Sequence, residues 1–172
     1  MRGITYVMAR AFVLRDEVIV HAPLQRCFLL STSVEIVQRE LRMEPVEGRT
    51  SGLVQAGDTV LWRGFKFGLL QFHQSVIEEF RSPVYFSDRM VAGRFRAFQH
   101  CHAFEPLPDG LVRMRDEVRF TMRWGLFGVI LGRILIAPHV RNLLRRRFAL
   151  LKRIAESDEW RKFVSDENFV AP

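Results

Sequence analysis

Apolar residues near the start of the chain change from a strand-like to a helical spacing. Residues 10–22 (RAFVLRDEVIVHA) are rich in β-branched and aromatic side chains with broken alternation, which predicts a strand ending before Pro23. Residues 24–31 and 34–41 then carry apolar side chains at helical spacings, and Ser33 with its neighbours Ser31 and Thr32 offers an N-cap between them. We therefore expect one strand followed by two short helices.

Strands and turns alternate from residue 42 to residue 124. Turn residues fill 48–57, and the predicted strands are 59–67, 69–81, 84–91, 94–105 and 111–124. Only short connections, such as Gly68 and Ala92–Gly93, separate these strands. Short connections favour antiparallel hairpins.

The last predicted strand separates an apolar face from a charged one. Charged side chains alternate along this strand with an apolar set, which is Val112, Met114, Val118, Phe120, Met122 and Trp124. Such alternation is typical of a strand with one buried and one wet side. Asp116 is the exception, because it places a carboxylate among the apolar side chains.

A long amphipathic helix is predicted over residues 133–165. Its apolar stripe contains Val140, Leu143, Leu144, Phe148, Leu151 and Ile154, and Pro138 either marks its first turn or kinks it. The preceding stretch 124–138 (WGLFGVILGRILIAP) is the most apolar of the chain, but it falls short of the about 20 residues that span a bilayer. We expect it to be a buried loop or an apolar lid that borders a pocket.

This order of elements predicts an α+β fold of segregated elements, in which a curved antiparallel sheet wraps the long helix and leaves a cavity. The 172 residues suit a single domain, with 1–9 as a frayed N-terminus and 166–172 as a tail. The two cysteines, Cys27 and Cys101, form no CxxC motif, and the first ten residues lack a signal-peptide pattern. We expect a cytoplasmic protein that is a monomer or a homodimer.

Local motifs add a family resemblance over roughly residues 10–156. Residues 18–31 (VIVHAPLQRCFLLS), 86–104 (FSDRMVAGRFRAFQHCHAF) and 116–120 (DEVRF) resemble the START, birch-pollen-allergen and polyketide-cyclase (SRPBCC) superfamily, in particular its uncharacterised bacterial ligand-binding members. The pattern places an Asp before a Gly-x-Phe hairpin, then two alternate histidines, then Asp-Glu-Val. Here Phe98 stands where that pattern commonly has tryptophan, and Gly93-Arg94-Phe95 replaces Gly-Pro-Phe.

The resemblance implies a helix-grip fold with about six or seven strands around the C-terminal helix. It also implies a cavity for a hydrophobic or amphipathic small molecule, such as a lipid, sterol, quinone or polyketide. Some members of the superfamily are cyclases or aromatases and others only bind or carry, so the fold alone does not assign a function. We expect a binder without a cofactor first, and a cyclase-, aromatase-, hydratase- or dehydratase-like enzyme second.

The candidate chemistry centres on His100, His102 and Asp116. The two histidines are two residues apart on one strand, so they share a face. A register that pairs Phe104 with Val112 would set His100 opposite Asp116, and a hydrogen bond there would satisfy the buried carboxylate. A two-residue turn at Ala92–Gly93 would place Asp88 on the opposite face.

Three interpretations of this cluster are open. It could be a structural polar network, a polar anchor for a ligand, or a catalytic or metal-binding site. No nucleophilic serine or third histidine has a recognisable spacing, so we predict no metal. The predicted ligand-contacting residues are the two histidines with Trp62, Phe72, Phe86, Phe98, Phe104, Met114, Phe120, Trp124, Leu144 and Phe148.

The charge of the chain is strongly positive. Twenty-six Lys and Arg outnumber 19 Asp and Glu, which gives +7 and a pI near 10.4. The excess lies mainly in residues 141–153 and on the charged face of the last strand. It could be a solvated face, a contact to anionic lipid headgroups, or a contact to RNA or a ribosome; the last ranks lowest because no nucleic-acid motif is visible.

Overall fold

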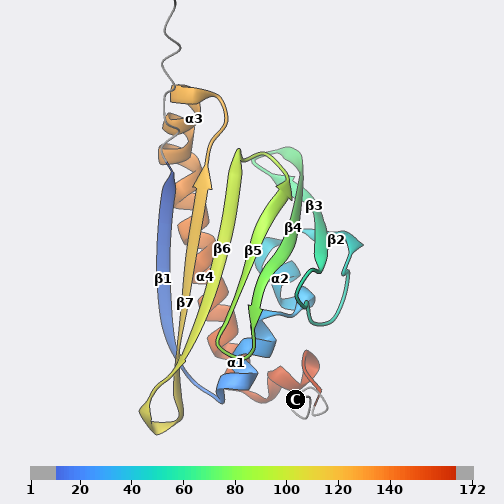
Figure 1. The fold of residues 1–172 in the computed structure, drawn as a ribbon, viewed down its shortest axis with the longest axis vertical. Helices are drawn as coiled ribbons and strands as arrows, with labels where there is room; N and C mark the ends of the chain where they lie inside the picture. The colour runs from blue at the N-terminus through green and yellow to red at the C-terminus, as the bar shows by residue number, and fades with distance from the viewer. Residues whose placement is uncertain (1–10, 166–172) are drawn as a thin grey trace, which may run out of the picture.

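The computed structural model describes residues 11–165, which form a curved antiparallel sheet around a long helix (Figure 1). The seven strands lie in the order β1-β7-β6-β5-β4-β3-β2. Their bounds are β1 (Phe12–His21), β2 (Glu44–Gly48), β3 (Thr59–Lys66), β4 (Leu69–Arg81), β5 (Tyr85–Ala92), β6 (Ala97–Pro106) and β7 (Leu111–Thr121). The helices are α1 (Leu24–Ser31), α2 (Val34–Leu41), α3 (Gly125–Leu131) and α4 (Ala137–Ala155). The predicted fold class is confirmed.

Both short helices have the predicted bounds. The Ser33 hydroxyl accepts a hydrogen bond from the backbone N–H of Ile36, as expected of an N-cap. Strand β2 was not predicted. It has the sequence EPVEG, lies at the sheet edge, and pairs with β3 through a bulge between Pro45 and Glu47, so neither alternation nor β-propensity marks it.

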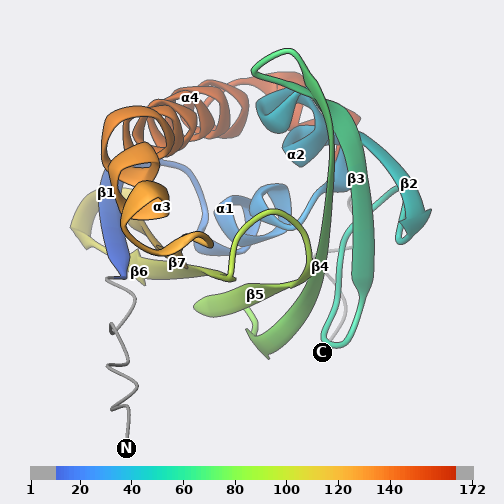
Figure 2. The same cartoon turned by 90° about the horizontal axis from the view of Figure 1, so that it is seen from above.

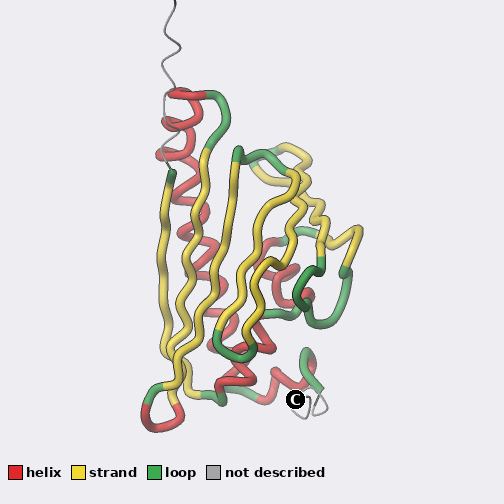
Figure 3. Tube along the Cα trace, in the orientation of Figure 1, coloured by secondary structure: helices red, strands yellow, loops and turns green. Residues whose placement is uncertain are grey.

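The C-terminal helix begins earlier and ends sooner than predicted. Helix α3, a π-helical turn at Gly132–Ile136 and α4 form one continuous helix, Gly125–Ala155, with Pro138 in the first turn of α4. By length and composition this helix could cross a membrane, and only 22% of its most apolar window is buried, although its α4 part packs on the sheet. The expectation of a buried loop at 124–138 is therefore wrong, and the alternative, an apolar lid that borders a pocket, stays a prediction. Figure 3 shows the helix continuing beyond the ends of the strands.

The core lies between the concave face of the sheet and α4. Leu144, Phe148, Leu151 and Ile154 of α4 are all buried against it. Below them the Phe28 ring meets the rings of Phe80, Phe86 and Phe104 at centroid distances of 5.2, 5.7 and 5.4 Å. The predicted frayed N-terminus, 1–9, and the predicted tail, 166–172, lie outside the described residues.

The convex face of β1, β6 and β7 carries a ladder of ion pairs. Arg113 and Arg115 pair with Glu105, and Arg115 also pairs with Glu17. Glu117 lies between Arg15 and Arg119, with N–O distances of 2.6 and 3.0 Å. Exposed pairs stabilise a fold by little, but these pairs neutralise most of the arginines that the sequence placed on this face.

Candidate functional site

A cavity of about 450 Å³ lies between the sheet, α2 and the continuous helix. This volume is in the range of small-molecule sites. Viewed from above, the β3–β4 and β5–β6 connections and α3 surround one end of it (Figure 2). We call that end the mouth, and the opposite end, where Phe86 packs on Phe28, the floor.

Most of the predicted ligand-contacting residues line this cavity. They are Trp62, Phe72, Phe86, Phe98, His100, His102, Trp124 and Leu144. Phe104, Met114, Phe120 and Phe148 do not line it. Phe104, Met114 and Phe148 belong to the core below the cavity, and Phe120 stacks on Phe12 at a centroid distance of 4.9 Å.

The β6–β7 register differs from the predicted one. Phe104 lies opposite Met114, His102 opposite Asp116 and His100 opposite Val118. The cause is the turn, which is centred on Asp109 in the left-handed conformation with φ of 60°. This turn shifts the pairing by two residues and retains the inward face, so His102 rather than His100 is the direct neighbour of Asp116.

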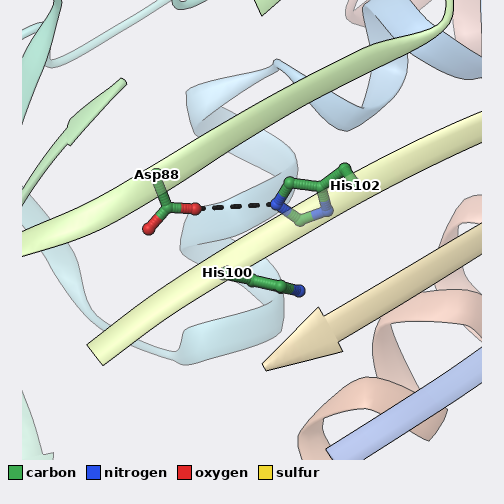
Figure 4. A group of neighbouring side chains, drawn as sticks. All are labelled: Asp88, His100 and His102. Carbon is green, nitrogen blue, oxygen red and sulfur yellow. Dashed lines mark ion pairs between the residues drawn. The ribbon is translucent and has the colours of Figure 1, made fainter. Parts of the chain in front are cut away.

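Asp88 lies on the same face as the histidines, whereas a two-residue turn at Ala92–Gly93 was expected to place it on the opposite face. It sits opposite His100 in the β5–β6 pair, because residues 93–96 form a longer connection than predicted. Figure 4 shows Asp88 on β5 facing His102 on β6, with His100 beside them. The Asp88 Oδ1 atom is 3.6 Å from His102 Nε2.

A buried polar network, three of whose members (Glu40, His102 and Arg147) also line the cavity, lies beside these residues. His102 Nδ1 donates to Asp116 Oδ1 at 2.8 Å, and Arg147 Nε donates to Asp116 Oδ2 at 2.9 Å. Arg147 also donates to Glu40 of α2 at 2.9 Å. The four side chains are between 3% and 6% exposed, so this network joins β6, β7, α2 and α4 in the interior.

Arg147 was missed at the level of sequence, although a signal was present. It follows Leu144 by three residues and precedes Leu151 by four, so it lies on the apolar stripe of the helix. A charged residue on such a stripe requires a buried partner. Its partners come from α2 and β7, and no spacing in the sequence reveals them.

Charges within the network set the ionisation of its members. Burial opposes ionisation of Asp116, but His102, Arg147 and His100 hold its pKa well below the usual 3.8. Burial favours a neutral His102, but Asp116 outweighs this effect and raises the pKa of His102 above 6.5. His102 is therefore an imidazolium over a wider pH range than an ordinary histidine, held between Asp116 and Asp88.

Two polar groups of the cluster remain available to the cavity. The Asp88 carboxylate makes only the long 3.6 Å contact to His102, and its pKa is lowered because His102 and His100 outweigh burial. His100 Nε2 is 3.2 Å from Asp116 Oδ2 but lies outside hydrogen-bond geometry, so that contact is electrostatic. Burial, with His102, lowers the pKa of His100. An anionic acceptor thus stands beside a neutral imidazole.

This arrangement has a limited chemical repertoire. Ligand atoms of Asp88, His100 and His102 lie within 4.8 Å of one another, a donor set that divalent metals accept. Arg147 places a guanidinium 3.4 Å from His102 Nδ1, and its positive charge opposes a cation there. A neutral ligand hydroxyl that donates to Asp88 adds no positive charge, so Arg147 does not oppose it.

Comparisons with known proteins assign the fold. A scan against family models gives no match, and neither does a search of the curated proteins. Among solved structures, the chain is similar to a Staphylococcus aureus protein of unknown function (TM-score 0.68, 10% identity, 89% of this chain and 98% of that one). It is also similar to Ara h 8.0201 (0.62, 13%, 85% and 98%). A third similar structure is Thalictrum flavum norcoclaurine synthase in complex with dopamine and hydroxybenzaldehyde (0.62, 11%, 91% and 95%). At these identities the likeness establishes the helix-grip fold alone.

Proposed function

We propose that this helix-grip protein binds a hydrophobic or amphipathic small molecule, such as a lipid, quinone or polyketide-like compound, in the cavity between sheet and helix. One observation carries the proposal: an apolar cavity of about 450 Å³ is lined by Asp88, which makes only a 3.6 Å contact to His102, and by His100, whose Nε2 has no hydrogen bond within the described chain. An apolar pocket with few convergent polar groups is the usual form of a small-molecule site.

Asp88 and His100 would fix the polar end of the ligand. The Asp88 carboxylate accepts from a hydroxyl or amine, and the neutral His100 ring offers either a donor or an acceptor nitrogen. The apolar remainder would then contact Trp62, Val140 and Leu144. The preferred ligand therefore carries a hydrogen-bond donor at one end of an apolar body.

The enzymatic alternative has a narrower basis than the sequence suggested. Asp116 does not line the cavity, and both of its oxygens are engaged by His102 and Arg147. A reaction of the cyclase, aromatase or hydratase kind would have to use Asp88 and His100 instead. Loss of turnover in His100→Phe without loss of ligand affinity would favour that alternative.

Native mass spectrometry of protein purified from its own host tests the binding proposal. We expect a co-purifying small molecule, and we expect it to be lost from Leu143→Trp, which fills the cavity from α4. Ala149→Trp is the matched control, because Ala149 is exposed on the same helix. Asp88→Asn should retain less ligand than the parent protein.

Two results would overturn the proposal. One is a parent protein that carries no molecule and takes up none from a mixture of lipids and quinones. The other is a bound molecule that remains in Leu143→Trp at the same occupancy as in Ala149→Trp.

A further inference from the structure

The mouth of the cavity is surrounded by exposed apolar side chains. We call Phe67, Leu69, Trp124, Leu126, Phe127 and Ile134 the mouth patch. Leu126, Ile134, Phe127 and Trp124 are 75%, 72%, 67% and 61% exposed, and Leu69 and Phe67 are 53% and 49% exposed. Large apolar side chains gathered in this way mark an interaction surface rather than random surface composition.

The two halves of the mouth patch lie on the same opening. Phe67 and Leu69 come from the β3–β4 hairpin, and the other four come from the start of the continuous helix. Phe67 contacts His139 of α4 with ring centroids 4.9 Å apart, and Phe67, Leu69 and Trp124 all line the cavity. Figure 2 shows the β3–β4 hairpin and α3 at the same end of the molecule, the end turned toward the viewer.

The helical half of the patch is held in place by two glycines. A Cβ at Gly128 would lie 1.7 Å from the Arg123 carbonyl oxygen, and one at Gly132 would lie 2.7 Å from the Phe12 ring. The inner side of this helical segment is thus packed closely against residues 122–123, which follow β7, and against β1. Because the inner side is fixed in this way, the apolar outer side of the segment stays exposed to solvent.

The charges around the mouth are of one sign. The segments 59–77, 89–104 and 118–155, parts of which form the rim, contain no aspartate or glutamate. Arg94, Arg133 and Arg141 are exposed there, and none of the ion pairs in the described chain involves them. Basic side chains that surround exposed apolar side chains are complementary to a partner whose outer layer is anionic and whose interior is apolar.

We propose that the mouth patch docks onto a lipid bilayer that contains anionic lipids. The apolar side chains insert among the acyl chains, and the arginines contact the headgroups. The cavity mouth then faces the bilayer, so a ligand passes between membrane and cavity without crossing water; this last step rests on the proposed function.

A second copy of this chain fits the patch less well. In a two-fold dimer the same surface meets itself, so Arg94, Arg133 and Arg141 of one copy would approach their equivalents. No acidic residue in the three rim segments would offset that repulsion. An anionic bilayer provides both the apolar interior and the opposite charge.

Vesicle sedimentation tests the docking. We expect the protein to pellet with vesicles of phosphatidylcholine containing about 30% phosphatidylglycerol, more weakly with phosphatidylcholine alone, and more weakly in high salt. Leu126→Ser/Phe127→Ser/Ile134→Ser should weaken binding at least about tenfold. Ile19→Ser/Val84→Ser is the control, since both residues are exposed, near the end of β1 and in the β4–β5 turn, away from the mouth.

Charge variants separate local docking from general attraction. Arg133→Glu/Arg141→Glu should abolish the preference for anionic vesicles. Arg81→Glu/Arg161→Glu makes the same change in net charge at exposed sites distant from the mouth, and it should retain most of the binding. Equal loss in both pairs would overturn the assignment to the mouth.

Tryptophan fluorescence gives a second readout. Trp62 and Trp160 are 4% and 5% exposed, whereas Trp124 is 61% exposed and lies in the patch. We expect vesicles to shift the emission to the blue, and we expect Trp124→Phe to lose that shift. No vesicle binding, together with a dimer that the triple serine variant dissociates, would assign the patch to a second copy and overturn the proposal.

The docking inference and the proposed ligand binding can be refuted independently of each other. Docking is measured with ligand-free vesicles and should persist in Leu143→Trp. A chain that docks but carries no ligand refutes the proposed function alone, and a chain that carries a ligand but never docks refutes this inference alone.

Discussion

Arg147 Nε donates to Asp116 Oδ2 across 2.9 Å, which joins the middle of α4 to β7 by an ion pair whose side chains are each 3% exposed. Because Arg147 also donates to Glu40, α2 is held by the same guanidinium. Three elements that form the cavity wall are therefore fixed by one side chain. This structural role differs from the role that we propose for Asp88 and His100, which is to contact the ligand.

Replacement of Arg147 should strongly destabilise the protein. Arg147→Met leaves Asp116 and Glu40 buried without their partner, which costs about 3–5 kcal/mol. Urea denaturation measures the change in the free energy of unfolding. The control is Arg145→Met on the exposed face of α4, which should stay within about 0.5 kcal/mol of the parent protein. Equal effects of the two variants would refute the structural role.

The ionisation of His102 should depend on Asp116. NMR titration of the histidine ring protons should give His102 a pKa above 6.5 and His100 a pKa below it. Because folding raises the pKa of His102, its contribution to stability is complete below pH 6.5 and is lost as the pH rises through the folded-state value. Asp116→Asn should lower the pKa of His102, and an unchanged value would contradict this coupling.

Asp116 should contribute to stability with the opposite dependence on pH. Its folded-state pKa lies well below 3.8, so the contribution is present above pH 3.8 and is lost as the pH falls toward the folded-state value. Denaturation curves of the parent protein and Asp116→Asn, measured across the acid range, should therefore converge at low pH. Curves that stay parallel would show that the carboxylate is not ionised in the fold.

The two aspartates should respond differently to the same substitution. Asp88→Asn should change the free energy of unfolding by about 1 kcal/mol or less, because Asp88 makes only a 3.6 Å contact to His102. Asp116→Asn should cost several times as much, since it weakens two buried hydrogen bonds. Ligand retention in native mass spectrometry should fall in Asp88→Asn.

The contact of α3 with residues 122–123, just after β7, should tolerate no side chain at Gly128. In Gly128→Ala the new Cβ meets the Arg123 carbonyl at 1.7 Å, so the helix must move, at a cost of about 1–3 kcal/mol. Hydrogen exchange of α3 amides and thermal denaturation measure this effect. Ile130→Ala, at an exposed position of the same helix, should change stability by no more than about 0.5 kcal/mol.

The periodicity of apolar residues predicted which helices and strands form, but it did not predict the register between paired strands. The bounds of α1 and α2 follow from apolar spacing, and the alternation over 111–122 gives the inward face of β7. The β6–β7 register depends on the left-handed conformation of Asp109, and the face of Asp88 depends on the length of a loop. Such local conformations have weak sequence signals.

The candidate site was also predicted only in part, because some of its contacts form only when distant elements pack together. His100, His102 and Asp116 could be found because their strand positions share a face. Glu40 and Arg147 could not be paired, because they are 107 residues apart and meet only when α2 and α4 pack together. The exposed helix start was also missed, since an apolar run carries no signal of which partner will cover it.

Acidic residues at the end of the molecule away from the mouth stand in ion pairs: Glu105 with Arg113 and Arg115, Glu156 with Lys152, and Asp158 with Arg161. The unpaired positive charges of Arg94, Arg133 and Arg141 therefore lie to one side of the described part of the molecule. In the field of an anionic surface such a body experiences a torque before it makes contact. It would thus arrive with its mouth already turned toward that surface.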